Sequence, residues 1–519
     1  MPRYKHYDYN QTSMVVINFE EQIQPGTFEY ALHHLISDRL DLTPFDDLYC
    51  NDGKAGGRPA YDPAILLKII LFAYSKGITS SREIQWCCEH NIIFKALSCD
   101  SVPHFTTIAA FVSSYPLEIE HLFEQVLLVC DQEGLLGKEL FAIDGCKLPS
   151  NASKEWSGTF KELAEKREKI QRQIRYWMSE HDKTDKDSDD NRRQERIEKT
   201  VSTLNRAFDK INQFLKTQSP RTGVNKLGSE VKSNITDNES AKMKTSKGTI
   251  QGFNGIATVD KKHQIIVDAQ AFGHGQEQHT LKPILAEVRE RFQRLRIREN
   301  ILKDGVIITA DTGFASIANN EYLYSNKINA YIPDNRFRSR DERFDDQKDK
   351  YGHRHEENRK STRHKQIPAS EFDFDPTKNT CVCPEGNALT FNKIREDEQG
   401  NRNAFFTGKL LDCRTCSRKE QCMVNPESAD HRKGSGRQVS FRVYSVTPTY
   451  TDWMKARIDS DEGKRIYSHR MSTVEPVFAN LEHNKGLKRF SLRGKKKVQT
   501  QWQLYAMVHN IEKLIPQIR

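Results

Sequence analysis

The sequence lacks an apolar run long enough to cross a membrane. Its strongest candidate, residues 64–73, is shorter than the roughly 20 residues that a spanning helix needs, and Lys68 interrupts it. The first residues, MPRYKHYDYNQ, contain no apolar secretion signal. Hydrophobic residues make up only 36% of the chain and charged residues 29%, which predicts charged insertions around small cores. We therefore expect a cytoplasmic protein that does not bind membranes.

An even set of cysteines, as a disulfide framework requires, is also missing. The chain has 11 cysteines and no secretion signal. Five of them fall in one short region, and the spacing Cys413-x2-Cys416-x5-Cys422, preceded by Cys383, predicts a structural Zn²⁺ site closed by four thiolates. Two alternatives remain open: the thiols are reduced and hold no metal, or Cys381 takes the place of Cys383 as the first ligand.

The net charge is modest for a chain of this length, but it is unevenly distributed. The formal net charge is +9 over 519 residues. From Lys485 to Arg519 there are nine basic residues and one acid, Glu512, so this segment carries nearly the whole surplus. A concentrated basic segment predicts a polyanion partner, whereas a solvated helix end is the plain alternative. The residues of this segment that we assign to nucleic-acid binding are Lys485, Lys488, Arg489, Lys495, Lys496 and Lys497.

Changes of composition divide the chain, which is too long for one core. Residues 1–137 have apolar residues at helical spacing and predict a helical domain, either a helix-turn-helix-like DNA reader or a plain bundle. Residues 138–332 and 441–519 alternate strand and helix patterns, which predicts an α/β domain with a mixed sheet. Two insertions interrupt it: residues 154–245 include an antiparallel helical hairpin, and residues 333–440 are charged and rich in cysteine.

Three acidic residues stand beside apolar segments. Asp144 and Asp311 each end an apolar run that predicts a buried strand, and Glu475 lies in a later helix, where we expect it on the core-facing side. Pro476 predicts a helix start or kink beside Glu475. A carboxylate near buried surface costs free energy unless it is paired or holds a metal. Two strand-end aspartates and a helical glutamate match a two-metal phosphoryl-transfer site, for which Mg²⁺ or Mn²⁺ is suited.

Each of these acids also has a plain interpretation. An aspartate after an apolar run is often a turn residue or a helix cap. Asp260 lies in a Lys-Lys-His turn, and we assign it no part in the chemistry. Asp268 interrupts an apolar strand; a fourth acid of the site is one interpretation, but we expect its side chain to face outward.

Four segments resemble the DDE transposases of bacterial insertion sequences. They are Asp-Gly-Cys-Lys-Leu-Pro-Ser-Asn-Ala-Ser-Lys at 144–154, and the segments 243–254, 310–316 and 474–478. Residues 45–112 are similar to the helical N-terminal domain that many of these transposases carry. The resemblance implies an RNase H-like catalytic domain in which Asp144, Asp311 and Glu475 are the catalytic, metal-binding residues.

The resemblance also implies the reaction and the partners. The family hydrolyses DNA at the ends of its element with Mg²⁺, and the freed 3′-hydroxyl attacks target DNA. Double-stranded DNA is then the partner, a homodimer is expected when two ends are brought together, and the protein acts on the bacterial nucleoid. Tyr467, Arg470 and Glu475 resemble the Tyr-Arg-Glu-Lys signature, whose basic residues contact phosphates. Glu482 stands where the signature lysine falls, and Lys485 is the expected substitute.

Two other functions fit the same residues. An RNase H-like nuclease or resolvase would cut DNA without joining strands. A transposase-derived DNA-binding protein would have lost the chemistry, but the presence of all three acids argues against it.

Overall fold

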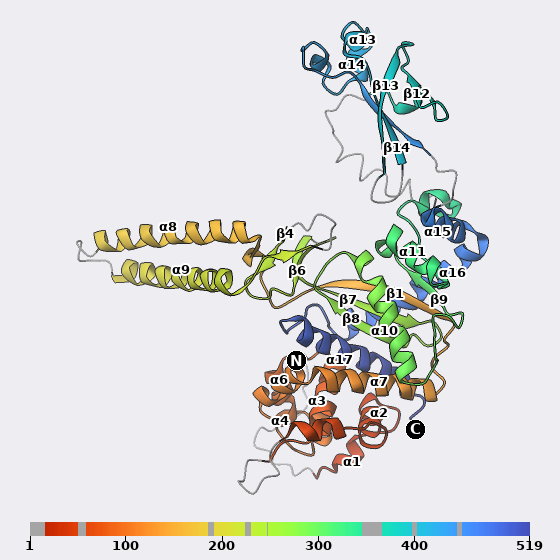
Figure 1. Cartoon of the computed structure of the whole chain (residues 1–519). Helices are drawn as coiled ribbons and strands as arrows, with labels where there is room; N and C mark the ends of the chain where they lie inside the picture. The colour runs from red at the N-terminus through yellow and green to blue at the C-terminus, as the bar shows by residue number, and fades with distance from the viewer. Residues whose placement is uncertain are drawn as a thin grey trace, which may run out of the picture. The chain divides into compact units, whose positions relative to one another are not determined.

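The computed structural model describes residues 16–49, 59–184, 191–223, 230–246, 248–344, 366–396, 402–443 and 449–518. The chain divides into two compact units, one made of Met1–Val306 with Arg470–Arg519 and the other of Ile307–His469. Both units combine helices and strands, so the predicted multidomain α/β class is confirmed (Figure 1). Among the described residues, no helix has both the length and the apolar composition needed to cross a membrane.

The first unit begins with short helices. The predicted helical pattern at 28–40 forms a helix followed by a π-helical turn at Leu35–Arg39, and the pattern at 61–76 forms the largely buried α3. Asp62 caps α3, because its carboxylate accepts the N–H of Ala64 at 2.7 Å. The helices are α1 (Phe19–Gln22), α2 (Phe28–His34), α3 (Pro63–Ser75), α4 (Ser81–His90), α5 (Ile92–Ser98), α6 (Phe105–Ser114) and α7 (Pro116–Gln132).

A sheet of antiparallel strands follows the helices. The predicted hairpin at 250–272 is confirmed as β7 (Gly248–Asp260) and β8 (Ile266–Phe272). β7 also pairs with β1 (Leu140–Pro149) and with β6 (Ala241–Thr245). The helix α10 (Leu281–Arg294) packs on this unit through Ile284, Leu285, Val288 and Phe292, which are fully buried.

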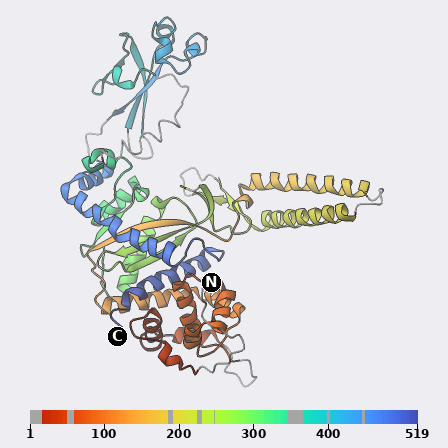
Figure 2. The ribbon, with the colours of Figure 1, turned by 180° about the vertical axis from the view of Figure 1, so that it is seen from behind.

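The last helix, α17 (Lys495–Leu514), packs on both the sheet and the N-terminal helices (Figures 1 and 2). Tyr505 stacks on Tyr74 of α3 with ring centroids 4.8 Å apart. On the other side, Trp502 Nε1 donates to the carbonyl of Ile256 in β7 at 3.0 Å. The helical region and the sheet therefore share one core, although the predicted domain boundary at 137 remains a prediction.

Polar side chains of α17 also cover the outer edge of β8. The Asn510 side chain accepts the N–H of Ile266 at 2.8 Å and donates to its carbonyl at 2.9 Å. Gln499 does the same for the N–H of Ala271 and the carbonyl of Ala269, at 2.7 and 2.6 Å. His509 Nε2 donates to the carbonyl of Gln264 at 2.8 Å. An exposed strand edge is a site of unwanted pairing, and here side-chain amides replace a neighbouring strand.

Asp260, to which we assigned no chemistry, has a structural role. It is fully buried, and its carboxylate accepts the N–H groups of Gly137, Lys138 and Lys262 at 2.8–3.1 Å. Burial raises the pKa of Asp260, whereas these backbone donors oppose the rise. The carboxylate thus joins the start of β1 to the turn between β7 and β8.

The insertion contains the predicted helical hairpin. α8 (Phe160–Thr184) and α9 (Asn191–Thr217) lie side by side in both views (Figures 1 and 2). They share an apolar seam of Leu163, Ile170, Ile174, Ile211 and Phe214. Short strand pairs at the base are β2 (Ser157–Gly158) with β5 (Ser233–Asn234), and β3 (Arg221–Thr222) with β4 (Glu230–Val231).

The second unit holds the remaining elements. β9 (Ile307–Ala310) and β10 (Ala330–Tyr331) pair in parallel, joined by α11 (Ile317–Ser325), as the sequence predicts. α15 (Tyr450–Asp459) follows, and α16 (Asp461–Ala479) leads back into the first unit. The cysteine-rich part consists of β11 (Asp373–Asp375), β12 (Thr380–Val382), β13 (Ala388–Glu396), β14 (Arg402–Thr407), α13 (Leu410–Arg414), α14 (Lys419–Cys422) and β15 (Gln438–Val443).

The hydrogen bond from His509 of α17 to the carbonyl of Gln264 makes the stability of the fold depend on pH. Burial lowers the pKa of His509 from 6.5 to about 4, so the imidazole is neutral and donates to Gln264. As the pH falls, His509 is protonated in the unfolded chain before it is protonated in the folded one. The contribution of neutral His509 to the free energy of unfolding is therefore complete above about pH 6.5 and is lost as the pH falls towards 4. Between about pH 7.5 and 5, the free energy of unfolding should fall by about 2 kcal/mol more in the wild type than in His509→Gln. Urea unfolding at both pH values measures this difference, and equal losses in the two proteins would contradict it.

Candidate active site

Asp144 lies inside β1 rather than at the strand end that the sequence predicts. The apolar run stops at Ile143, but backbone pairing with β7 continues to Pro149, with Asp144 opposite Ala257. The Asp144 side chain is 22% exposed, and its Oδ1 accepts the N–H of Gly145 at 2.9 Å. The carboxylate is therefore presented from the rigid middle of a sheet and remains partly open to solvent.

Arg470, which we assigned to phosphate contact, is instead the ion-pair partner of Asp144. The guanidinium lies 2.7 Å from Asp144 Oδ2, and its side chain is only 9% exposed. A charge-assisted hydrogen bond of this length offsets the cost of keeping a carboxylate beside the core. α16 thus brings Arg470 to β1 and fixes the orientation of Asp144.

The helical face that carries Glu475 is exposed, so the predicted core-facing position is wrong. The residues of α16 that turn inward are Arg470, Thr473, Val474 and Val477, whereas Met471 and Glu475 lie on the exposed side. The apolar spacing from Met471 to Phe478 misled the prediction, because Val474 and Val477 define the true buried stripe.

The helix also continues through Pro476, so of the predicted start or kink beside Glu475 the start is wrong and the kink stays a prediction. Pro476 has no N–H to donate to the carbonyl of Ser472, four residues earlier. The side-chain amide of Gln264 donates to that carbonyl at 3.1 Å. This hydrogen bond from the β7–β8 turn lets α16 keep a proline one residue after Glu475.

Glu482, which stands where the signature lysine falls, is a further acid after Glu475. Cys146 lies two residues after Asp144, so the two side chains share a face of β1. Burial raises the pKa of the Cys146 thiol well above its ordinary value, and the charges of Glu482 and Asp144 raise it further. The charge of Glu482 thus acts on the Cys146 thiol. The spacing of seven residues between Glu475 and Glu482, two helical turns, is the sequence signal for this acid.

Asp311 lies in the second unit, at the end of β9 as predicted. Its carboxylate accepts the N–H of Thr312 at 2.5 Å and the Thr312 hydroxyl at 3.2 Å, which caps a short 3₁₀ turn. The side chain is half-buried. Asp311 thus caps the 3₁₀ turn, as the alternative interpretation predicts, and its carboxylate is also held at the end of β9. Tyr467, also in this unit, packs edge-on against Phe337 with ring centroids 5.4 Å apart.

Lys485, the expected substitute for the signature lysine, is not available to DNA. Its side chain is 8% exposed, and its ammonium pairs with Glu512 of α17. Burial of the ammonium therefore requires Glu512, the one acid of the basic segment. We correct the assignment of Lys485 from phosphate contact to a buried ion pair.

Six other basic residues of this segment, all before or in the first turn of α17, are exposed. Arg489 donates to the carbonyl of Ser150 at 3.3 Å and Arg493 to that of Asn151 at 2.7 Å, so the loop before α17 follows the end of β1. Lysines at a helix N-terminus oppose the helix dipole, which makes the first turn of α17 a costly place for three of them. We call the following exposed residues the basic turn: Lys488, Arg489, Arg493, Lys495, Lys496 and Lys497.

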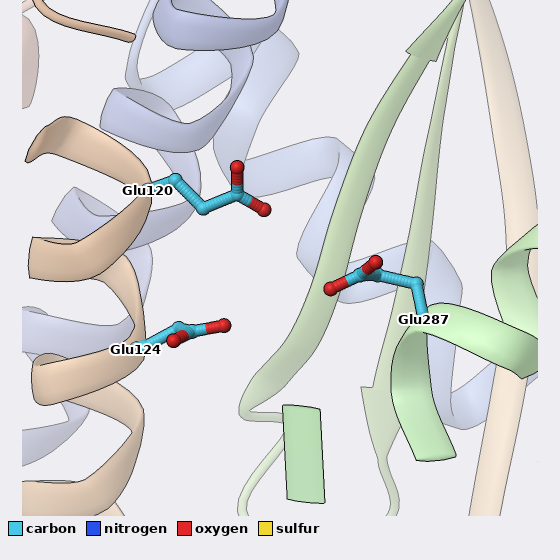
Figure 3. Close-up of side chains that lie close together, drawn as sticks. All are labelled: Glu120, Glu124 and Glu287. Atoms are coloured by element: carbon cyan, nitrogen blue, oxygen red, sulfur yellow. The ribbon is translucent and has the colours of Figure 1, made fainter. Parts of the chain in front are cut away.

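A second acidic cluster lies between α7 and α10 (Figure 3). Among the described residues, Glu120, Glu124 and Glu287 are the one group of three or more potential metal ligands whose ligand atoms all lie within 4.8 Å of one another. Arg291, only 1% exposed, lies 3.2 Å from each of the three carboxylates.

Two further contacts complete this cluster. Arg291 also pairs with Asp268 of β8, and Arg294 pairs with Glu124 and Glu287. Asp268 is therefore buried and paired, so the predicted outward position is wrong. Burial raises the pKa of Asp268, and the charge of Arg291 opposes the rise. Because guanidinium groups already occupy the space between the carboxylates, we interpret the cluster as a structural ion-pair network rather than a metal site.

This interpretation predicts the effect of removing the cation. Arg291→Met leaves buried carboxylates uncompensated and should lower the free energy of unfolding by about 3–5 kcal/mol. The matched control Arg289→Met, at a half-exposed position of the same helix, should change it by less than about 0.5 kcal/mol. Urea unfolding at neutral pH measures both. Stabilisation of the wild type by Mg²⁺ that disappears in Glu287→Gln would show instead that the cluster binds metal.

Comparison with known families gives two matches. Residues 17–114 match the family described as Transposase domain (DUF772), and residues 382–515 match the family described as Transposase DDE domain. No curated protein matches the chain. The first match covers α1 to α6, and the second contains Arg470, Glu475 and most of the cysteine-rich part. Together the matches support a DNA transposase.

Proposed function

We propose that this chain, an insertion-sequence DDE transposase by its two family matches, cleaves DNA at the ends of its element and joins the freed 3′ ends to target DNA. The observation that carries the proposal is the ion pair between Asp144 and Arg470. It brings α16, the helix of Glu475, onto the strand that holds the first acid. Such a carboxylate on a rigid strand, next to a helix with further acids, is suited to bind metal ions and DNA phosphates.

Asp311 completes the proposed site. In the RNase H-like arrangement that the resemblance implies, Asp311, at the end of β9, is the second acid of the site. The antiparallel β1–β7–β8 group and the parallel β9–β10 pair are the strand orientations that this arrangement needs.

Asp144, Asp311 and Glu475 are the residues that would hold the metal. Carboxylate oxygens are the ligands that Mg²⁺ and Mn²⁺ prefer, and Asp144 and Glu475 are both open to solvent. When bound, the metal ions would activate water or a 3′-hydroxyl and stabilise the leaving oxygen. Arg470 keeps the Asp144 carboxylate oriented, so that the acid does not have to reorganise when DNA binds.

The basic turn is the proposed contact with the DNA backbone. Its cations lie on a loop tied to the end of β1, the strand of Asp144, by Arg489 and Arg493. Phosphates would relieve the repulsion between the lysines and the N-terminus of α17. The N-terminal helical region is the second proposed DNA-binding part, and a homodimer on the nucleoid would hold two transposon ends together.

The catalytic proposal predicts that each acid is indispensable. Asp144→Asn, Asp311→Asn and Glu475→Gln should each lower the rate of end cleavage by at least about two orders of magnitude, because each removes a charged metal ligand. DNA binding should remain, since these residues lie outside the basic turn. The matched control Glu462→Gln, an exposed acid in the first turn of α16, should keep wild-type activity.

The assay uses DNA that carries the element's ends, with Mg²⁺ and a supercoiled target. Cleavage without joining would favour the nuclease. Binding without cleavage by the wild type would favour a DNA-binding protein that has lost the chemistry. Full activity of Asp144→Asn would remove Asp144 from the site.

The DNA-binding proposal predicts a change in salt dependence. Replacing Lys495, Lys496 and Lys497 together by Ala should weaken binding to all DNA sequences and reduce the slope of log K against log salt by about 2–3. The variant should be at least as stable as the wild type, because the lysines oppose the helix dipole. The control replaces Arg296, Arg298 and Lys303, which are exposed after α10. An equal loss in the control would mean that the basic turn has no special role.

A further inference from the structure

Four cysteines of the cysteine-rich part surround one cavity. Cys383 follows β12, Cys413 lies in α13, Cys416 follows that helix, and Cys422 ends α14. All four line the same cavity, together with the buried Ile367 and Phe372 and the side chain of Arg437. Residues that are up to 39 positions apart in the chain therefore meet at one place.

Cys381, the alternative first ligand, is excluded by its position. It is 1% exposed, lies in β12 opposite Leu389, and belongs to the apolar core that includes Phe372 and Phe406. Cys381 thus fills the core, and it does not line the cavity that the other four cysteines share.

Backbone N–H groups around the cavity donate hydrogen bonds to two of the cysteine sulfurs. The N–H of Asn387 donates to Cys383 Sγ at 3.3 Å, in a tight turn where Gly386 has a φ of +81°. The N–H of Arg437 donates to Cys413 Sγ at 3.5 Å. Such N–H···S hydrogen bonds stabilise the thiolate form that binds metals.

Two glycines make room for the sulfur of Cys413. A Cβ atom at Gly408 or at Gly436 would lie 2.9 Å from Cys413 Sγ, closer than atoms in contact approach. The two glycines face each other, since the N–H of Gly408 donates to the carbonyl of Arg437 at 2.7 Å. The end of β14 and the start of β15 are thereby packed against the thiol.

Arg437 also lines the cavity of the four cysteines. Arg437 is held in place by its stacking on Phe372 at 5.6 Å and by a hydrogen bond to the carbonyl of Ile367 at 3.0 Å. A fixed cation beside four thiols partly compensates the negative charge that four metal-bound thiolates would carry.

We propose that Cys383, Cys413, Cys416 and Cys422 bind one structural Zn²⁺ ion. Four thiolates suit the tetrahedral coordination of zinc and leave no position open for catalysis. The ion would draw the four sulfurs together and join β12, α13 and α14, which are short elements around a small core. This site is independent of the proposed DNA chemistry and serves the folding of the cysteine-rich part.

The test measures metal bound to the purified full-length chain. Elemental analysis should find about one zinc per chain, and Cys413→Ser and Cys422→Ser should lose it. The matched control Cys381→Ser should retain zinc, since that thiol belongs to the core. Asp144→Asn should also retain it, so failure of the catalytic proposal would leave this result unchanged.

A second measurement uses the wild type alone, so its result does not depend on whether the cysteine variants fold. In the wild type, alkylation of Cys383, Cys413, Cys416 and Cys422, identified by mass spectrometry, should be slow until a strong chelator is added and fast afterwards. Wild-type protein refolded with excess zinc that still binds none would overturn the proposal, as would iron in place of zinc. Equal loss of zinc in Cys381→Ser and Cys413→Ser would overturn the ligand assignment.

Discussion

The arrangement of the first unit depends on α17, which is buried on nearly all sides. Its amide side chains, Asn510 and Gln499, satisfy the outer edge of β8, and its aromatic residues fill the space between the sheet and the N-terminal helices. Each polar group that such a helix buries without a partner costs on the order of 1–3 kcal/mol, so the paired amides stabilise its position, although the Gln503 side chain and the Tyr505 hydroxyl have no hydrogen-bond partner among the described residues. The same helix begins with the lysines of the basic turn. The segment that closes the core therefore also fixes where the proposed DNA contact lies relative to β1.

Buried carboxylates are compensated in two ways in this protein, and the difference distinguishes a structural ion-pair network from a candidate catalytic site. Around Arg291, guanidinium groups fill the space among the carboxylates and link α7, α10 and β8. At Asp144, Arg470 pairs with one carboxylate oxygen, the N–H of Gly145 donates to the other, and the side chain is 22% exposed. An open, oriented carboxylate can accept a metal ion, whereas a carboxylate surrounded by arginines cannot do so without unfolding its partners. Among the described residues, Glu120, Glu124 and Glu287 form the closest group of acids, yet they are less suited to bind a metal ion than Asp144 is.

Sequence patterns predicted elements well where one periodicity dominated. The β7–β8 hairpin, the α8–α9 hairpin and the β9–α11–β10 sequence are present within a few residues of their predicted bounds. Errors arose where side-chain polarity was taken as a guide to backbone or facing. β1 continues past Asp144 because pairing is a property of the backbone, and Asp268 is buried because a distant arginine compensates it. The face of α16 was misjudged because Met471 and Phe478 outweighed Val474 and Val477 in the pattern.

The sequence by itself identified the three candidate acids, the cysteine spacing, the basic segment and the resemblance to DDE transposases. Each of these features depends only on residues that are close together in the sequence. Only the tertiary structure decided which charges are free to act. Arg470 pairs with Asp144, Lys485 with Glu512 and Asp268 with Arg291, across separations of 326, 27 and 23 residues. It likewise placed Cys381 in the core and the other four cysteines of its region around a cavity. The physical reason is that burial and partnership depend on the packing of distant segments, which set the cost of a charge or the reactivity of a thiol.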